Sequence, residues 1–86
     1  MTRVNRFLLT NATRKRLVLT LEPWAEQYIY NPGQILEVRQ ECAHESETVE
    51  LEYSDLGVTL FTGGVCKVYS NDEELKPLDH WVDRLD

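Results

Sequence analysis

The sequence lacks most of the features that mark a specialised small protein. It has only two cysteines, Cys42 and Cys66, which is too few for the disulfide framework of a small secreted domain. No apolar run is long enough for a membrane span or for the core of a signal peptide. These absences predict a cytoplasmic protein with reduced thiols and no membrane association.

Metal ligands are also scarce and widely spaced. Cys42, His44, Cys66 and His80 do not form the close Cys-x₂₋₄-Cys and His-x₃₋₅-His pairs of structural zinc sites. The segment CAHESE offers one histidine where a cupin metal site uses two. The sequence therefore predicts no bound metal and no cofactor.

Catalytic patterns are missing as well. No serine stands in a nucleophile elbow, and the pair Gly63-Gly64 lacks the strand-to-helix setting of a phosphate-binding loop. Most carboxylates alternate outward along the expected strands, where water surrounds them. We therefore expect a non-catalytic binding or protein-interaction module. The alternative is a cupin-like enzyme that binds a small ligand or a metal.

The charge is acidic overall and unevenly distributed. The net charge is −6, which disfavours nucleic acid as a partner because phosphates would be repelled. Residues 1–21 hold five basic residues and no acid, whereas residues 22–86 hold four basic and fifteen acidic residues, a net charge of −11. The basic start either meets an acidic surface, on its own domain or on a second copy, or guards an edge strand against aggregation.

Alternation of apolar and polar residues is the dominant pattern. RLVLTLE places its leucines on one face of a strand, ILEVRQE places Leu36 and Val38 inward, and TVELEY does the same for Val49, Leu51 and Tyr53. Asn31-Pro32-Gly33-Gln34 fits a type II turn, and Gly63-Gly64 fits a two-residue hairpin. Residues 1–86 thus form one all-β domain, a compact antiparallel β-sandwich or small barrel of about seven short strands.

The last ten residues follow a different period. Leu78, Trp81, Val82 and Leu85 recur at helical spacing after Pro77, which predicts a short C-terminal helix over residues 77–86. Its single apolar stripe packs either on its own domain or against another chain. These four residues are therefore the candidate interface, and the candidate partner is a second copy in a homodimer or another protein.

The Pro-Trp segment LEPWAEQYIYNPG is the candidate binding surface. Pro23 cannot donate a hydrogen bond to a sheet, so the strand from Leu17 should end there and leave Trp24 on a connecting segment. Such a tryptophan either lids the core or binds a ligand. If it binds, Glu22 and Glu26 favour a cationic or hydroxyl-bearing ligand.

The longer run LEPWAEQYIYNPGQILEV resembles small uncharacterised bacterial proteins in which a Leu-Glu-Pro-Trp-x-Glu segment precedes a Pro-Gly turn and a strand. The resemblance covers residues 17–38. It implies a bacterial β-domain and brings with it no activity, cofactor or catalytic residue.

Overall fold

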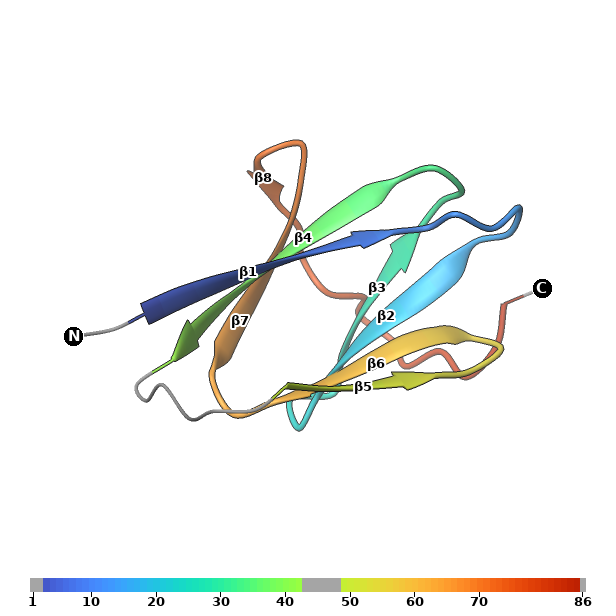
Figure 1. Cartoon of the computed structure of the whole chain (residues 1–86). Helices are drawn as coiled ribbons and strands as arrows, with labels where there is room; N and C mark the ends of the chain where they lie inside the picture. The colour runs from blue at the N-terminus through green and yellow to red at the C-terminus, as the bar shows by residue number, and fades with distance from the viewer. Residues whose placement is uncertain (1–2, 43–48, 86) are drawn as a thin grey trace.

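The alternating segments fold into two β-sheets in the computed structural model, which describes residues 3–42 and 49–85. One sheet has the strand order β1-β4-β7-β8 and the other β3-β2-β6-β5, so β1 and β5 are both edge strands (Figure 1). The all-β prediction is confirmed. The strands are β1 (Arg3–Thr10), β2 (Leu17–Glu22), β3 (Glu26–Tyr30), β4 (Ile35–Cys42), β5 (Val49–Tyr53), β6 (Gly57–Thr62), β7 (Val65–Ser70) and β8 (Glu73–Glu74).

The apolar positions of the strands form one core shared by the two sheets. Leu36 and Val38 of β4 are fully buried, as are Leu19 and Leu21 of β2, which confirms the inward faces expected for both strands. Burying each such side chain stabilises the fold by about 1.5–3 kcal/mol. The core cluster is Leu19, Leu21, Tyr28, Tyr30, Val58 and Leu60 from one sheet, and Leu36, Val38, Cys66 and Val68 from the other.

Strands β2 and β6 pair in parallel, with Val18 opposite Gly57 and Leu21 opposite Leu60. The expectation of a wholly antiparallel arrangement is wrong at this pair. Between β2 and β6 the chain leaves its sheet to form β4 in the other one. A parallel pair needs such a long connection, whereas an antiparallel pair can be joined by a tight turn.

The Pro32-Gly33 turn is formed as expected. The amide of Gln34 donates to the carbonyl of Asn31 at 3.0 Å, and Gly33 has a φ of 81°, which a side chain would strain. However, β3 and β4 belong to different sheets, so the turn carries the chain from one sheet to the other.

The predicted Gly63-Gly64 hairpin is wrong. β6 pairs with β2 and β5, whereas β7 pairs with β4 and β8, so these two glycines also join different sheets. Neither takes a positive φ. Gly64 is required for close approach instead, because a Cβ atom there would lie 2.1 Å from the carbonyl oxygen of Glu41.

A polar contact ties β6 to the other sheet beside this crossing. The Gln40 amide nitrogen donates to the hydroxyl of Thr62, and the Gly64 amide donates to the same hydroxyl at 3.3 Å. Gln40 and Thr62 are both buried. Their hydrogen bonds therefore satisfy polar groups that the core would otherwise penalise.

Asn11 joins two crossings between the sheets. It follows β1, and its side chain is fully buried at 0% exposure. Its amide nitrogen donates to the carbonyls of Lys15 and Tyr30 at 2.8 and 3.1 Å, and its side-chain oxygen accepts the Thr13 amide at 3.0 Å. Its carbonyl accepts the Gly33 amide at 2.8 Å. Asn11 therefore joins the β1–β2 connection to the Pro-Gly turn.

We predict that Asn11→Ala lowers the free energy of unfolding by about 2–4 kcal/mol, because the Tyr30 carbonyl and the Thr13 amide lose their partner and the Lys15 carbonyl keeps only the Thr13 hydroxyl. Urea unfolding measures the change. The matched control is Asn31→Ala at an exposed asparagine of the turn, which should cost about 0.5 kcal/mol or less. Equal stability of the two variants would contradict the structural role of Asn11.

The C-terminal segment is extended, so the predicted helix over residues 77–86 is wrong for the described part, which ends at residue 85. Gln27 of β3 replaces the hydrogen bonds that a helix would make. Its carbonyl accepts the Leu78 amide at 2.8 Å, its side-chain nitrogen donates to the Val82 carbonyl at 2.7 Å, and its side-chain oxygen accepts the Val82 amide at 2.7 Å. A ten-residue helix is marginal in water, so these contacts prevail.

The extended segment covers the outer face of the sheet that contains β2. Thr20, Gln27 and Val82 line one shared hollow on that face. Val18 and Thr20 point away from the core, yet both are buried. Residues 78–85 therefore act as a third layer over the middle of this sheet.

We predict that Gln27→Ala lowers the free energy of unfolding by about 1–3 kcal/mol, since a buried amide is lost and both backbone groups of Val82 lose a partner. A chain that ends at Lys76 should lose at least as much, because Val18 becomes exposed. Urea unfolding measures both changes, and for Gln27→Ala the rate of tryptic cleavage at Arg84 should rise as well. The exposed tail substitution Asp79→Asn should leave stability within about 0.5 kcal/mol. A Gln27→Ala protein with unchanged stability and unchanged cleavage would contradict the role of Gln27 in holding the C-terminal segment.

Candidate functional site

Trp24 and Glu26, two of the three predicted ligand-binding residues, lie together. Trp24 belongs to the short connection between β2 and β3 and Glu26 begins β3, while Ala25 between them takes a φ of 57°. Trp24 is 50% exposed and lines a hollow of about 360 Å³ with Glu26, Cys66 and Lys67. Glu22 lines different hollows, beside Phe61. The structure therefore separates Glu22 from the other two.

The chemistry of the Trp24 hollow is limited. Burial raises the pKa of the Cys66 thiol, so this sulfur stays protonated and is a poor nucleophile. Burial, reinforced by the charge of Glu26, likewise raises the pKa of Tyr28 to about 12. Lys67 brings its own cation to the hollow, so a cationic ligand gains less from Trp24 and Glu26 than the sequence suggests.

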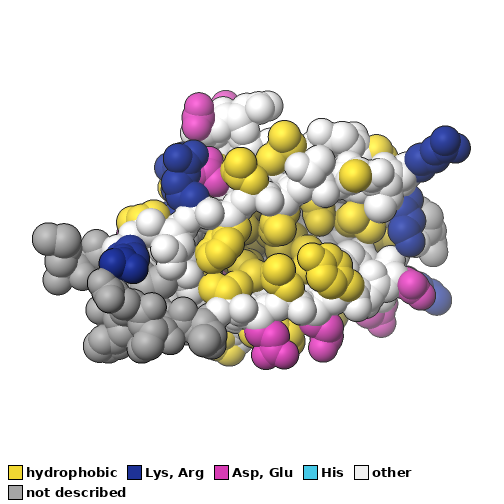
Figure 2. Space-filling model, in the orientation of Figure 1, with side chains coloured by type: hydrophobic (Ala, Val, Ile, Leu, Met, Phe, Trp, Pro, Cys, Tyr) yellow, Lys and Arg dark blue, Asp and Glu magenta, His cyan; other side chains and the backbone are white. Residues whose placement is uncertain are grey.

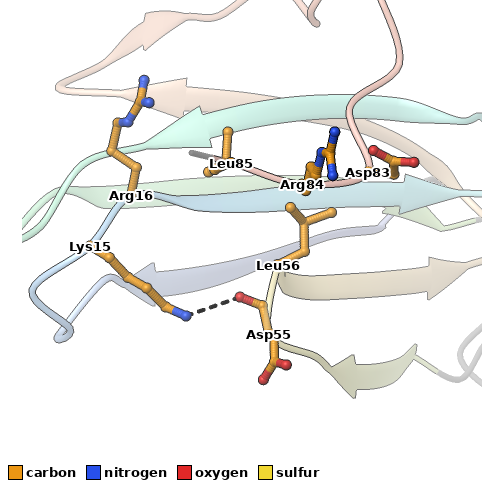
Figure 3. A pocket seen from close by; sticks show the side chains of 7 residues that line it. All are labelled: Lys15, Arg16, Asp55, Leu56, Asp83, Arg84 and Leu85. Carbon is orange, nitrogen blue, oxygen red and sulfur yellow. Dashed lines mark hydrogen bonds between the residues drawn. The ribbon is translucent and has the colours of Figure 1, made fainter.

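The four residues of the predicted C-terminal interface are spread along the extended tail. Leu78 and Trp81 are exposed, Trp81 by 59%, whereas Val82 and Leu85 are half-buried. Leu85 and Leu56 lie among charged side chains around a hollow of about 440 Å³ beside the β1–β2 connection (Figure 3).

The charged side chains around this hollow do not converge. Lys15 donates through its Nζ to the carbonyl of Asp55 at 3.2 Å, while Arg16 points away from it (Figure 3). Asp83 and Arg84 lie on the tail side. These side chains therefore pack beside the C-terminal segment and do not surround a common point at which a ligand atom could bind.

Metal-binding side chains do not gather in the described part of the chain. No group of three histidine, cysteine, aspartate or glutamate residues is close enough there to hold a metal ion. His80 is exposed on the tail. His44 and the rest of the CAHESE loop, together with the side chain of Cys42, lie outside the described residues. Residues 3–42 and 49–85 also contain no helix with the length and hydropathy to cross a membrane.

A hollow that the sequence did not predict lies between the edge strands β1 and β5. It has a volume of about 500 Å³, and we call it the β1–β5 groove. Figure 2 shows apolar side chains gathered in the hollowed centre of this face, between the positions of the two strands in Figure 1. Its apolar lining consists of Leu8, Leu9, Leu17, Tyr30, Tyr53 and Val58, with Ala12 beside them.

The groove exists because β5 presents an apolar face that no strand covers. Leu51 lies opposite Leu60, and Tyr53 lies opposite Val58, so both are on the core-facing side of their sheet. Nevertheless Leu51 is 43% exposed and Tyr53 is 77% exposed. The alternation of TVELEY predicted which side of β5 faces the core side of its sheet, but the expectation that Leu51 and Tyr53 lie inward as core residues is wrong, because nothing in the described part of the chain covers them.

The two strands that border the groove carry opposite charges. β1 contains Arg3 and Arg6 and no acid, whereas β5 contains Glu50 and Glu52 and no base. Acidic side chains follow the lower rim of the hollow in Figure 2, on the side of β5. An edge strand exposes backbone groups that can pair with another strand, and charges control which strand is accepted.

Arg6 is held in place by a charged cluster on the outer face of its sheet. Its Nε donates to Glu37 at 2.5 Å, and Arg39 donates to the same oxygen at 2.9 Å. The Arg39 guanidinium also lies 3.8 Å from the centre of the Tyr69 ring. The hydrogen bonds from Arg39 and then Arg6 lower the pKa of Glu37 to about 2.

Comparison with known proteins finds no matching family model, no matching curated protein and no matching solved structure. The function of the chain is therefore inferred from the geometry and chemistry of its own surfaces.

The Glu37 cluster should make the fold sensitive to acid. Because the pKa of Glu37 is lower in the folded chain than in the unfolded chain, its contribution to stability is complete above about pH 4.5 and is lost as the pH falls towards about 2. We predict that Glu37→Gln flattens the pH dependence of unfolding in this window. Urea unfolding between pH 2 and pH 6 measures it, with Glu73→Gln on β8 as an exposed control. A steep loss in Glu37→Gln equal to that of the parent chain would contradict this assignment.

Proposed function

We propose that this domain is a non-catalytic protein-interaction module that binds an extended polypeptide segment in the β1–β5 groove. The observation that carries the proposal is Tyr53, a large aromatic residue that is 77% exposed beside an apolar hollow between two edge strands. Exposed apolar surface that gathers in one hollow marks a binding surface more often than scattered apolar residues do.

The chemistry of the groove suits an extended peptide. An added strand can pair its backbone with an edge strand while alternate side chains enter the apolar hollow. Both elements are present here, since β1 and β5 are edges and the space between them is lined by leucine, valine and tyrosine. We infer that the two sheets form a sandwich left open along this side.

Other classes of function find less support. The groove lining includes Lys15, Asp55 and Ser54, but the Lys15 ammonium donates to the backbone carbonyl of Asp55 and the Ser54 hydroxyl accepts the Leu56 amide, so these groups serve the backbone and are not arranged as a nucleophile beside a base. A net charge of −6 opposes nucleic acid. The proposed module therefore works without a metal or cofactor, inside the cytoplasm and away from membranes.

The test places a photo-crosslinking residue, benzoylphenylalanine, at Tyr53 in the full chain within its native cells. Trp81 is the matched control, because it is also an exposed aromatic residue but lies on the tail over the other face of the β5 sheet. We expect mass spectrometry to find one dominant crosslinked protein from position 53, joined through an extended segment, and little from position 81.

A second variant separates binding from folding. Leu51→Lys introduces a charge on the core-facing side of β5, at a residue that is already 43% exposed. We expect it to abolish the crosslink from position 53 while the thermal unfolding transition remains. A crosslink that survives Leu51→Lys, or that forms equally from position 81, would overturn the proposal and return attention to the C-terminal residues.

A further inference from the structure

We propose that the segment bound in the β1–β5 groove is strand β5 of a second copy of this chain, and that the second copy reciprocally receives β5 of the first. Each β1 would then lie beside the β5 of the other copy. This inference rests on the proposed function, because it names the occupant of the same groove.

Charge decides which edges can meet. β1 carries Arg3 and Arg6 without an acid, and β5 carries Glu50 and Glu52 without a base. Two β1 strands placed side by side would repel each other, as would two β5 strands, whereas β1 beside β5 attracts. Between the two strands that border the groove, the charges therefore favour a reciprocal arrangement with β1 of each copy beside β5 of the other.

The apolar sides of the two strands match in this arrangement. Phe7 and Leu9 of β1 pack against the core of their own sheet pair, and Leu51 and Tyr53 of β5 face the core side of theirs. Placing β5 beside β1 continues one sheet into the other, so the core-facing sides stay on the same side. The exposed Leu51 and Tyr53 would then lie next to Phe7 and Leu9 of the other copy and be removed from water.

The outer sides match as well. Arg6 alternates with Phe7 and so lies on the outer side of β1, where Glu37 holds its Nε at 2.5 Å. Glu50 and Glu52 alternate with Leu51 and lie on the outer side of β5. A guanidinium has five N–H donors, so an Arg6 anchored through Nε can still bind a carboxylate of the second copy.

A second copy of the chain covers both exposed edge strands with a single partner. The reciprocal arrangement covers both edges and both halves of the groove in a single two-fold assembly, and β1 and β5 both cease to be edges. A foreign strand would fill one side of the groove and leave the other edge open.

The test reverses the charge of each edge and measures the mass of the full chain by light scattering after size exclusion, across micromolar to millimolar concentrations. We expect a dimer for the parent chain, and its dissociation constant should rise at least about tenfold for Glu50→Lys with Glu52→Lys, which makes both edges basic. The control is Glu73→Lys with Glu74→Lys, the same charge change on β8 at the opposite edge, which should leave the dimer intact.

The decisive measurement is a mixture. Arg3→Glu with Arg6→Glu makes both edges acidic and should also give a monomer, with thermal unfolding confirming that the chain still folds without the Arg6–Glu37 contact. Mixed in equal amounts, the acidic-edged and basic-edged chains should form a one-to-one heterodimer that neither forms alone. An unfolded variant could not restore association.

Three results would overturn the inference. These are a parent chain that remains monomeric, a dimer that is indifferent to the reversals of β5, and a mixture that fails to associate. A monomeric parent that still crosslinks from position 53 to another protein would leave the proposed function standing and remove only the second copy. The charges of β1 and β5 would then serve to guard the edges against aggregation.

Discussion

The buried amide of Asn11 fixes the place where the two sheets are joined. The connections between the two sheets bury part of their backbone at Asn11 and Gly64, and every buried N–H and C=O there needs a partner. Asn11 satisfies the β1–β2 connection and the Pro32-Gly33 turn together, and the Gln40–Thr62 contact satisfies the crossing at Gly64. The hydrophobic core is shared by the two sheets, while these polar contacts determine which loops lie against which.

The strands follow from the sequence, and their partners do not. Alternation in RLVLTLE and ILEVRQE is a local signal, and it identifies Leu19, Leu21, Leu36 and Val38 as core residues. Pairing depends on residues far apart in the chain, so the parallel β2–β6 pair has no local signature. Adjacent glycines fit a hairpin and a crowded crossing equally well, and only the carbonyl of Glu41 beside Gly64 distinguishes them. The tail has helical spacing, but the hydrogen bonds of Gln27 override it.

The candidate site was hidden from the sequence for a related reason. Trp24 could be identified from the sequence because the adjacent Pro23 ends its strand, which is a local signal, and the structure places Trp24 beside Glu26. The groove is assembled from β1 and β5, which are separated by some forty residues along the chain. Leu51 and Tyr53 have the pattern of ordinary core residues, and their exposure depends on where the opposite sheet ends. The sequence of a strand indicates which of its side chains share a face, but it does not indicate whether another strand packs against that face.

The tail that Gln27 holds in place changes the mutational tolerance of β2. Val18, Leu19, Thr20 and Leu21 are all buried, since the core lies on one side of the strand and residues 78–85 lie on the other. In most small β-domains every second position of a strand can vary freely because it faces water. In this domain β2 has no such position along those four residues, whereas Glu50 and Glu52 of β5 remain exposed. Sequence drift in this fold should therefore be concentrated at the edges of its sheets and nearly absent at the centre of one of them.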